Sequence, residues 1–174
     1  LKEIGQLDKA VKSYKTALKF EPDFVDAYNN LGVAFYDVRQ FEEALKSYKS
    51  VIKLDPEFAE AHNNLGITLK ELGRLDEAEK SYRKAIDLKP EYLAAMLNLS
   101  NLLDYMNNLD EAILILENIL KMSEGIYSLK ASVNLAIFSF LGDDIRTSKK
   151  HLSKIQKALN LDPDMYLLYW GYLL

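Results

Sequence analysis

Hydrophobic residues recur every three or four positions through most of this chain, and polar residues fill the positions between them. This spacing places the hydrophobic side chains along one face of an α-helix. The pattern itself returns after 34 residues, so that the run from Tyr28 to Gly32 recurs as the run from His62 to Gly66. A period of this length, with helical spacing inside each unit, is typical of tandem helix–turn–helix repeats. We therefore expect an all-α fold.

Each repeat is expected to contain a first helix, called helix A, and a second helix, called helix B. Gly73 and Asn107 suit the left-handed backbone that ends a helix A, whereas Arg39 departs from this pattern at the same place. Proline prevents a helix from continuing, and three expected B helices are followed by one, at Pro22, Pro56 and Pro90. Helix A is expected over residues 25–38, 59–72 and 93–106.

The whole chain, residues 1–174, is expected to form a single array of such repeats. The expected parts are a partial repeat over 1–22, repeats over 25–58, 59–92 and 93–126, a divergent repeat over 127–163, and the start of a further or capping helix over 164–174.

Both ends of the array are expected to be incomplete. The run from Leu1 to Gly5 matches the run from Leu69 to Gly73, so we expect the chain to open near the end of a helix A and to be an excerpt from a longer protein. Its first helix B is then expected from Asp8 to Phe20. At the other end, residues 165–174 are strongly apolar, and they offer a surface for end-to-end self-association.

Small residues recur where helices are expected to approach closely. We expect the small residues of helix A to face equally small residues of helix B, namely Gly32 and Ala44, Gly66 and Ala78, and Ser100 and Ala112. Tyrosines recur on helix B as well, and we expect them to fill the core rather than to bind a ligand: Tyr14, Tyr48 and Tyr82.

Each unit resembles a repeat of the tetratricopeptide repeat family. The resemblance lies in the order of its residues, which is a large residue followed by Leu-Gly, Ala, Tyr and Pro. This resemblance implies a right-handed α-solenoid in which helix A lines the concave wall of a groove. It also implies a non-catalytic module that binds a peptide or another protein. The Asn-Leu-Gly and Asn-Leu-Ala runs are most similar to the repeats of O-linked N-acetylglucosamine transferases.

Four asparagines hold the same place in successive A helices, one residue before the core leucine: Asn30, Asn64, Asn98 and Asn134. A primary amide both donates and accepts hydrogen bonds. Packed helices lie about 8–10 Å apart, which is about three residues of extended chain. We therefore expect these amides to form an asparagine ladder that holds the backbone of a bound peptide, as the transferase resemblance also implies. The alternative is that each amide bonds the neighbouring repeat or faces water.

The same periodicity places further side chains on the groove wall. Those assigned to the peptide-binding groove are Asn29, Asn63, Asn101, Tyr36, Lys70 and Tyr105. Acidic residues outnumber the one lysine on this wall, at Asp26, Asp37, Glu60, Glu71 and Asp104, so a polar or basic segment is the expected partner. For Asp26 and Glu60, an interaction with the positive end of their own helix is an equal alternative.

Composition excludes several classes of function. The chain has no cysteine and a net charge of −4, so we expect neither thiolate chemistry nor binding to nucleic acid or anionic membranes. Its two histidines, His62 and His151, have no partner at a spacing that indicates a metal site or a catalytic pair. We expect no enzyme, no metal and no cofactor. The sequence does not identify a compartment, and the cytoplasm is the default expectation.

Two other functions stay open at this stage. Incomplete ends and the apolar C-terminal stretch fit a self-associating structural scaffold. The transferase resemblance fits the substrate-recruiting arm of a glycosyltransferase-type enzyme.

Overall fold

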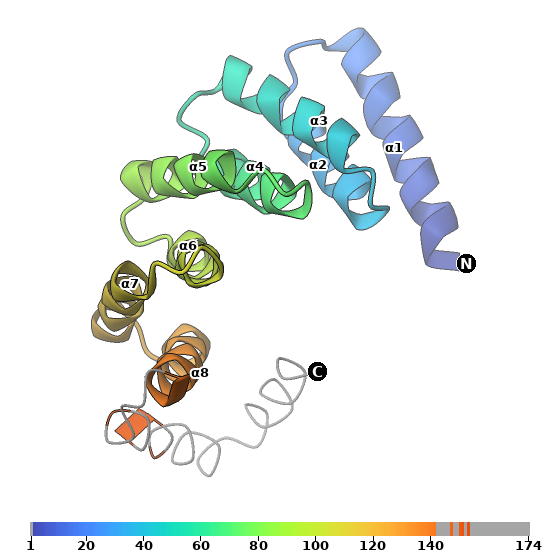
Figure 1. Ribbon diagram of the computed structural model, residues 1–174. Helices are drawn as coiled ribbons and strands as arrows, with labels where there is room; N and C mark the ends of the chain where they lie inside the picture. The colour runs from blue at the N-terminus through green and yellow to red at the C-terminus, as the bar shows by residue number, and fades with distance from the viewer. Residues whose placement is uncertain (1, 142–146, 148–149, 152, 154–174) are drawn as a thin grey trace. The chain divides into compact units, whose positions relative to one another are not determined.

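The computed structural model describes residues 2–141, 147, 150–151 and 153, and this part of the chain contains helices and no strands (Figure 1). The expected all-α fold is therefore confirmed. The chain divides into two compact units, Leu1–Ala95 and Met96–Leu174, which are described separately below.

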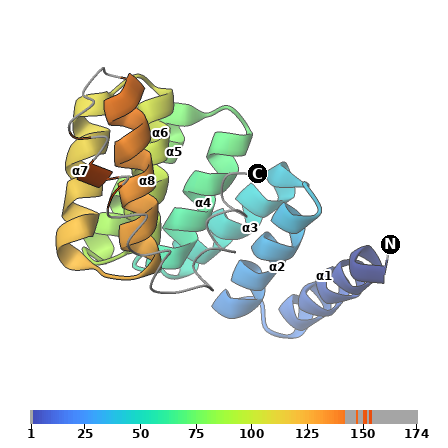
Figure 2. The ribbon, with the colours of Figure 1, turned by 90° about the horizontal axis from the view of Figure 1, so that it is seen from below.

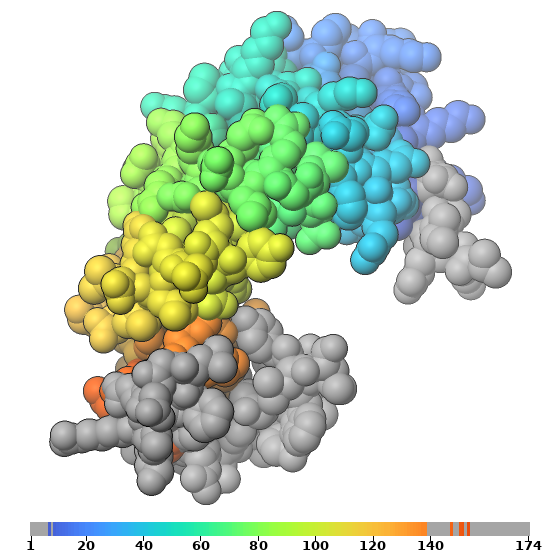
Figure 3. Space-filling view, in the orientation of Figure 1, coloured from blue at the N-terminus to red at the C-terminus, as the bar shows by residue number. Residues whose placement is uncertain are grey.

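The first unit contains five helices, each packed against the next, with α2 also in contact with α4. They are α1 (Lys2–Phe20), α2 (Val25–Asp37), α3 (Phe41–Leu54), α4 (Ala59–Glu71) and α5 (Leu75–Leu88). α1 lies at the edge of this unit beside α2 (Figure 2). In the space-filling view, side chains fill the spaces between α2 and α5 (Figure 3).

The second unit contains the main part of α6 (Leu93–Tyr105), together with α7 (Leu109–Met122) and α8 (Ile126–Leu141). α7 packs against α8. Residues 147, 150–151 and 153 are also helical. The three expected A helices thus begin where predicted and end one residue early, at Asp37, Glu71 and Tyr105. The repeat boundaries given above stay predictions.

The N-terminal helix differs from the expectation. α1 runs without interruption through Gly5 and Asp8, so the predicted start of a helix B at Asp8 is wrong. The later turns reverse the chain because long helices on both sides of them pack together. α1, in contrast, stays helical through Gly5, the residue that matches the turn glycine Gly73. The helix expected over 164–174, and with it the self-association surface, lies outside the described residues.

The three A-to-B turns share one backbone conformation. Arg39, Gly73 and Asn107 have φ angles of 60°, 73° and 62°. In the first turn the amide of Gln40 donates to the carbonyl of Phe35 at 2.8 Å, and the other two turns form the same bond. This conformation is uncommon for a residue with a Cβ atom. Arg39 therefore departs from the pattern in residue type and follows it in structure.

The small residues of helix A accommodate a tyrosine ring rather than an alanine. A Cβ atom on Gly32 would lie 2.6 Å from Cε1 of Tyr48, and one on Gly66 would lie 2.6 Å from Cε1 of Tyr82. The atoms nearest to each of these Cβ positions thus belong to a tyrosine ring, and the expectation that the glycines also face Ala44 and Ala78 stays a prediction. Tyr48 and Tyr82 are core residues as predicted, whereas Tyr14 on α1 is only half-buried.

At the matching positions of the second unit, Ser100 replaces glycine and Leu116 replaces tyrosine, and both are fully buried. The Ser100 hydroxyl donates to the carbonyl of Leu97 at 2.9 Å, so its polar atom is satisfied within the helix. A larger residue on helix A thus accompanies a smaller one on helix B, as close packing requires.

Candidate peptide-binding surface

The candidate surface of the first unit lies on α2 and α4. Residues spaced by three and four positions share a helix face, so Asn30 lies above Val33 on α2, and Asn64 lies above Ile67 on α4. Because α2 and α4 are in contact, these two faces are neighbours. Val33 of α2 and Asn64 and Ile67 of α4 line one pocket, whereas the place of Asn30 on the same surface stays a prediction.

A shallow pocket of about 180 Å³ opens between these helices. Its lining combines apolar and aromatic groups with one amide: Val33, Tyr36, Tyr48, Asn64 and Ile67. Tyr48 was expected only as a core residue, yet its ring also contributes to this pocket. Gly32 packs directly against this ring, and Tyr48 is only 2% exposed.

Tyr36 connects the pocket to a charged region. Its ring contacts that of Phe41, with centroids 5.4 Å apart. Burial and the nearby carboxylate of Glu71 raise the pKa of the Tyr36 phenol, Arg39 opposes this, and Asp37 adds to it. The phenol is therefore neutral at physiological pH and can donate a hydrogen bond.

The asparagines of the first unit differ in exposure. Asn30 is exposed and Asn64 is partly buried, so both amides are accessible from the surface. Asn63 is only 4% exposed, and its Nδ2 donates to Oδ1 of Asn64 at 3.4 Å. Asn29 is partly buried, with its Oδ1 buried and without a hydrogen-bond partner among the described residues. Lys70, which follows on α4, is exposed.

The second unit uses its asparagines differently. Asn134 on α8 is 5% exposed, and its Nδ2 donates to Oδ1 of Asn101 on α6 at 2.6 Å. This is the bond to a neighbouring repeat that the alternative interpretation expects. Asn98 is partly buried, and Tyr105 is 72% exposed. Ile137, one turn after Asn134, is an exposed apolar residue that the sequence analysis did not assign.

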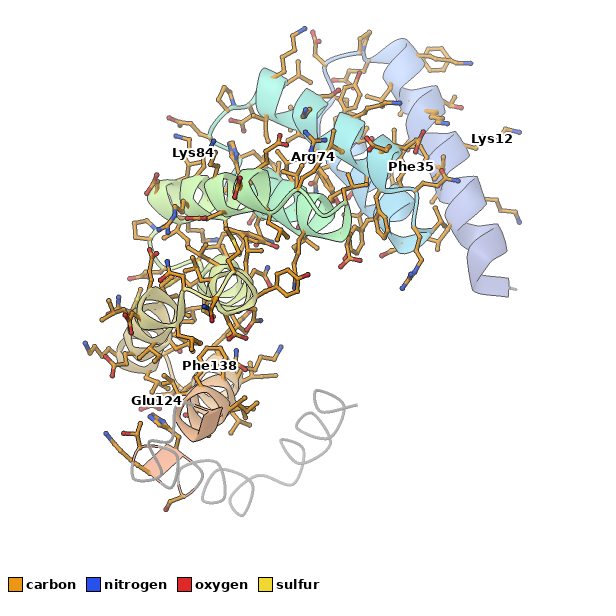
Figure 4. All side chains as sticks on the ribbon, viewed as in Figure 1. Lys12, Phe35, Arg74, Lys84, Glu124 and Phe138 are labelled. Carbon is orange, nitrogen blue, oxygen red and sulfur yellow. The ribbon has the colours of Figure 1, made fainter. Side chains whose placement is uncertain are left out.

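Charged residues modify the expectation of a basic partner. Glu60 lies 3.9 Å from Lys89, so part of the acidic character of the wall is balanced within the protein. Asp37 and Glu71, the last residues of α2 and α4, are exposed and form no ion pair within the described residues. Elsewhere, Lys12 and Lys84 point outward from α1 and α5 into solvent (Figure 4).

The described part of the chain offers neither a metal site nor a membrane-spanning helix. It contains no group of three or more histidine, cysteine, aspartate or glutamate side chains that could hold a metal ion. His62 instead contacts the carbonyl of Pro56 through Nε2 at 3.0 Å, a local structural role. None of the helices described here has the length and apolar character that crossing a membrane requires.

Three family models match the chain, one described as a TPR repeat over residues 1–38 and two described as tetratricopeptide repeats over residues 34–93 and 71–133. No curated protein sequence matches it. Among solved structures, one of MamA is similar with a TM-score of 0.81 and 26% identity, covering 90% of this chain and 92% of MamA.

Two further solved structures show the same fold at lower identity. MamA from Desulfovibrio magneticus RS-1 has a TM-score of 0.64 and 22% identity, covering 70% of this chain and 69% of that one. PilF of Pseudomonas aeruginosa has a TM-score of 0.78 and 21% identity, covering 88% of this chain and 69% of PilF. Tetratricopeptide repeats are in general non-catalytic modules that bind proteins or peptides. Residues 1–133 are therefore tetratricopeptide repeats, and the chain is built as an all-α solenoid.

Proposed function

We propose that the chain binds an extended segment of a partner protein, and that asparagine amides on the A helices hold the backbone of that segment. In the first unit this role belongs to Asn30 and Asn64, and in the second to Asn98. The observation that carries the proposal is the pair of accessible amides on the neighbouring helices α2 and α4, the second of which lines an open pocket.

The chemistry of the amide suits a backbone. An extended peptide presents one donor and one acceptor for each residue other than proline, and a primary amide can satisfy both kinds of group. Adjacent packed helices lie about 8–10 Å apart, so amides on successive A helices meet a peptide at about every third residue. Because they contact main-chain atoms, they provide affinity for many sequences.

Asn134 has a different role in this proposal. Its amide donates to Asn101, and exchanging that bond for one to a ligand would leave the Asn101 oxygen unsatisfied. We assign Asn134 to the structure of the second unit. The remaining groove residues Asn29, Tyr36, Lys70 and Tyr105 stay candidates for contact, with Tyr36 favoured because it lines the pocket. Asn63 is buried, and its amide donates to Asn64, so in this proposal it supports Asn64.

Peptide selection followed by affinity measurement tests the proposal. A library of random twelve-residue peptides is selected against the whole chain, and a labelled winner is titrated by fluorescence polarisation. Each lost hydrogen bond to a peptide is worth about 0.5–1.5 kcal/mol, so Asn30→Ala combined with Asn64→Ala should weaken binding about tenfold or more. The control is Asn118→Ala, which removes an exposed amide from α7 and should change affinity less than twofold.

A second measurement shows whether the main chain is what is held. Peptides carrying a single backbone N-methyl group, moved along the sequence, should lose affinity at positions about three residues apart. A folded double variant with unchanged affinity would refute the proposal. A selection that enriches no peptide, or a methylation scan without any sensitive position, would count against it as well.

A further inference from the structure

The two units differ in the residue that lies opposite the asparagine of the predicted ladder, which is Asn64 in the first unit and Asn134 in the second. In the second unit, Asn101 on α6 accepts a hydrogen bond from Asn134 on α8 at 2.6 Å. In the first unit, Val33 holds the position of Asn101, and it cannot form such a bond with Asn64. Val33 and Asn64 instead both line the open pocket between α2 and α4.

The size and lining of this pocket suit one apolar side chain. Its volume of about 180 Å³ exceeds the roughly 150 Å³ of an apolar protein cavity that accepts benzene. Val33 is 39% exposed, so the apolar wall is accessible to a ligand. Ile67 forms the opposite wall, and the rings of Tyr36 and Tyr48 complete the lining.

Two carboxylates lie one helical turn beyond the pocket. Asp37 follows Val33 by four residues and Glu71 follows Ile67 by four, so each carboxylate shares the face of the pocket residue before it. Both are exposed, and both end their helices, where the negative end of the helix dipole disfavours an acidic side chain. Among the described residues neither has an ion-pair partner, although Arg39 is close enough to act on the same tyrosine as they do.

We propose that the first unit selects a segment in which a side chain of the size of leucine, isoleucine, methionine or phenylalanine enters the pocket and a lysine or arginine within about three residues faces Asp37 and Glu71. The helix rise of about 1.5 Å per residue separates the apolar and acidic rows by about 6 Å, which a lysine or arginine side chain spans. This inference rests on the proposed function, because the amides of Asn30 and Asn64 hold the segment while the pocket and the carboxylates select its sequence.

Parallel selections from the same twelve-residue library test this specificity. Wild-type protein should enrich peptides with an apolar residue followed or preceded within three positions by lysine or arginine. Val33→Phe fills the pocket and should abolish the apolar preference. Asp37→Asn with Glu71→Gln should abolish the basic preference and keep the apolar one. The matched control is Asp87→Asn with Glu117→Gln, which removes two exposed carboxylates from α5 and α7 and should reproduce the wild-type selection.

Affinities for one selected peptide give the size of each effect. Replacing its apolar residue by alanine should weaken binding to the wild type about ten- to hundredfold, and to Val33→Phe less than threefold. Replacing its basic residue should weaken binding to the wild type about threefold at low salt, with no effect on the protein lacking both carboxylates. Circular dichroism confirms that each variant is folded.

The outcomes separate this inference from the proposed function. Selected peptides that need Asn30 and Asn64 but show no apolar or basic preference would overturn the inference and leave the amide clamp standing. The same result follows if Val33→Phe selects the same sequences as the wild type. Peptides that bind equally well without both asparagines would overturn the clamp itself, whatever their sequence.

Discussion

The contact between Gly66 and Tyr82 yields a stability prediction whose sign opposes helix propensity. On an exposed helix, Gly→Ala is stabilising by about 1 kcal/mol. Here the added Cβ atom would lie 2.6 Å from Cε1 and 2.7 Å from Cδ1 of Tyr82. Comfortable carbon–carbon contacts lie at about 3.5–4.0 Å, so the ring must retreat by about 1 Å.

The cost follows from the burial of the ring. Tyr82 is only 1% exposed, so its ring can move only by displacing other core atoms. Overpacking of this kind costs about 1–3 kcal/mol, and a rigid buried ring belongs in the upper part of that range. After the propensity gain of about 1 kcal/mol, Gly66→Ala is expected to lower the free energy of unfolding by about 1–2 kcal/mol.

Urea unfolding followed by far-ultraviolet circular dichroism measures this effect, and a second background isolates its cause. With Tyr82→Leu in place, the ring is gone and Gly66→Ala should stabilise by about 1 kcal/mol, a reversal of sign. The coupling between the two positions should then be about 2–3 kcal/mol. Gly73→Ala is the control, since its cost comes from a φ of 73° with no atom nearby and should not depend on Tyr82.

Two results would refute this account. One is a Gly66→Ala variant at least as stable as the wild type while Tyr82 is present. The other is an effect of Gly66→Ala that has the same sign and size with tyrosine and with leucine at position 82. Either would show that the ring moves at no cost, and that the glycine is not required by packing.

Three further predictions concern single side chains. Asn134→Ala leaves the Asn101 oxygen without its donor and should lower the free energy of unfolding by about 1–2 kcal/mol. Asn30→Ala should change the free energy of unfolding by less than about 0.5 kcal/mol, because this residue is exposed. Urea denaturation measures both variants, and an equal loss of stability in the two would contradict the prediction. Arg39→Gly relieves the strain of a left-handed residue with a Cβ atom and should stabilise the fold by about 1 kcal/mol. The melting temperature should rise in a thermal melt, and a lower melting temperature would contradict this. Burial raises the pKa of the Tyr82 phenol above its ordinary value near 10, so this phenol ionises in the unfolded chain before it ionises in the folded protein. The stabilising contribution of the neutral phenol is therefore complete below about pH 10, and it falls as the pH rises further. Tyr82→Phe should lessen that fall in urea titrations at increasing pH, and an identical pH dependence would contradict the assignment.

Local periodicity was enough to predict the helices and turns of the repeats. The A helices and the left-handed turns at Gly73 and Asn107 depend on neighbouring residues, so a single sequence specifies them. Arg39 shows that the tertiary arrangement determines the turn even where the residue type does not favour it. The continuous α1 could not be predicted from the match to a later repeat, because a glycine at the matching position permits a turn but does not require one.

The sequence pattern predicts the candidate site residues as equivalent positions, and the structure shows that their surroundings differ. Asn64 and Asn134 hold equivalent places, and the sequence pattern treats them alike. What differs is the residue across from each: Val33 beside Asn64 cannot accept a hydrogen bond, and Asn101 beside Asn134 does. Whether an amide is accessible therefore depends on a pair of residues more than thirty positions apart, which a repeat pattern does not reveal on its own.

The open pocket between α2 and α4 affects how a bound segment would be aligned on the first unit. Identical amides on identical repeats would form a periodic binding surface, along which a segment could slip by one repeat with no change in energy. A surface of that kind holds a partner without fixing which of its residues lies where. In the proposed complex, the apolar pocket of the first unit would remove this degeneracy, because a slip by one repeat would take the apolar side chain of the segment out of the pocket.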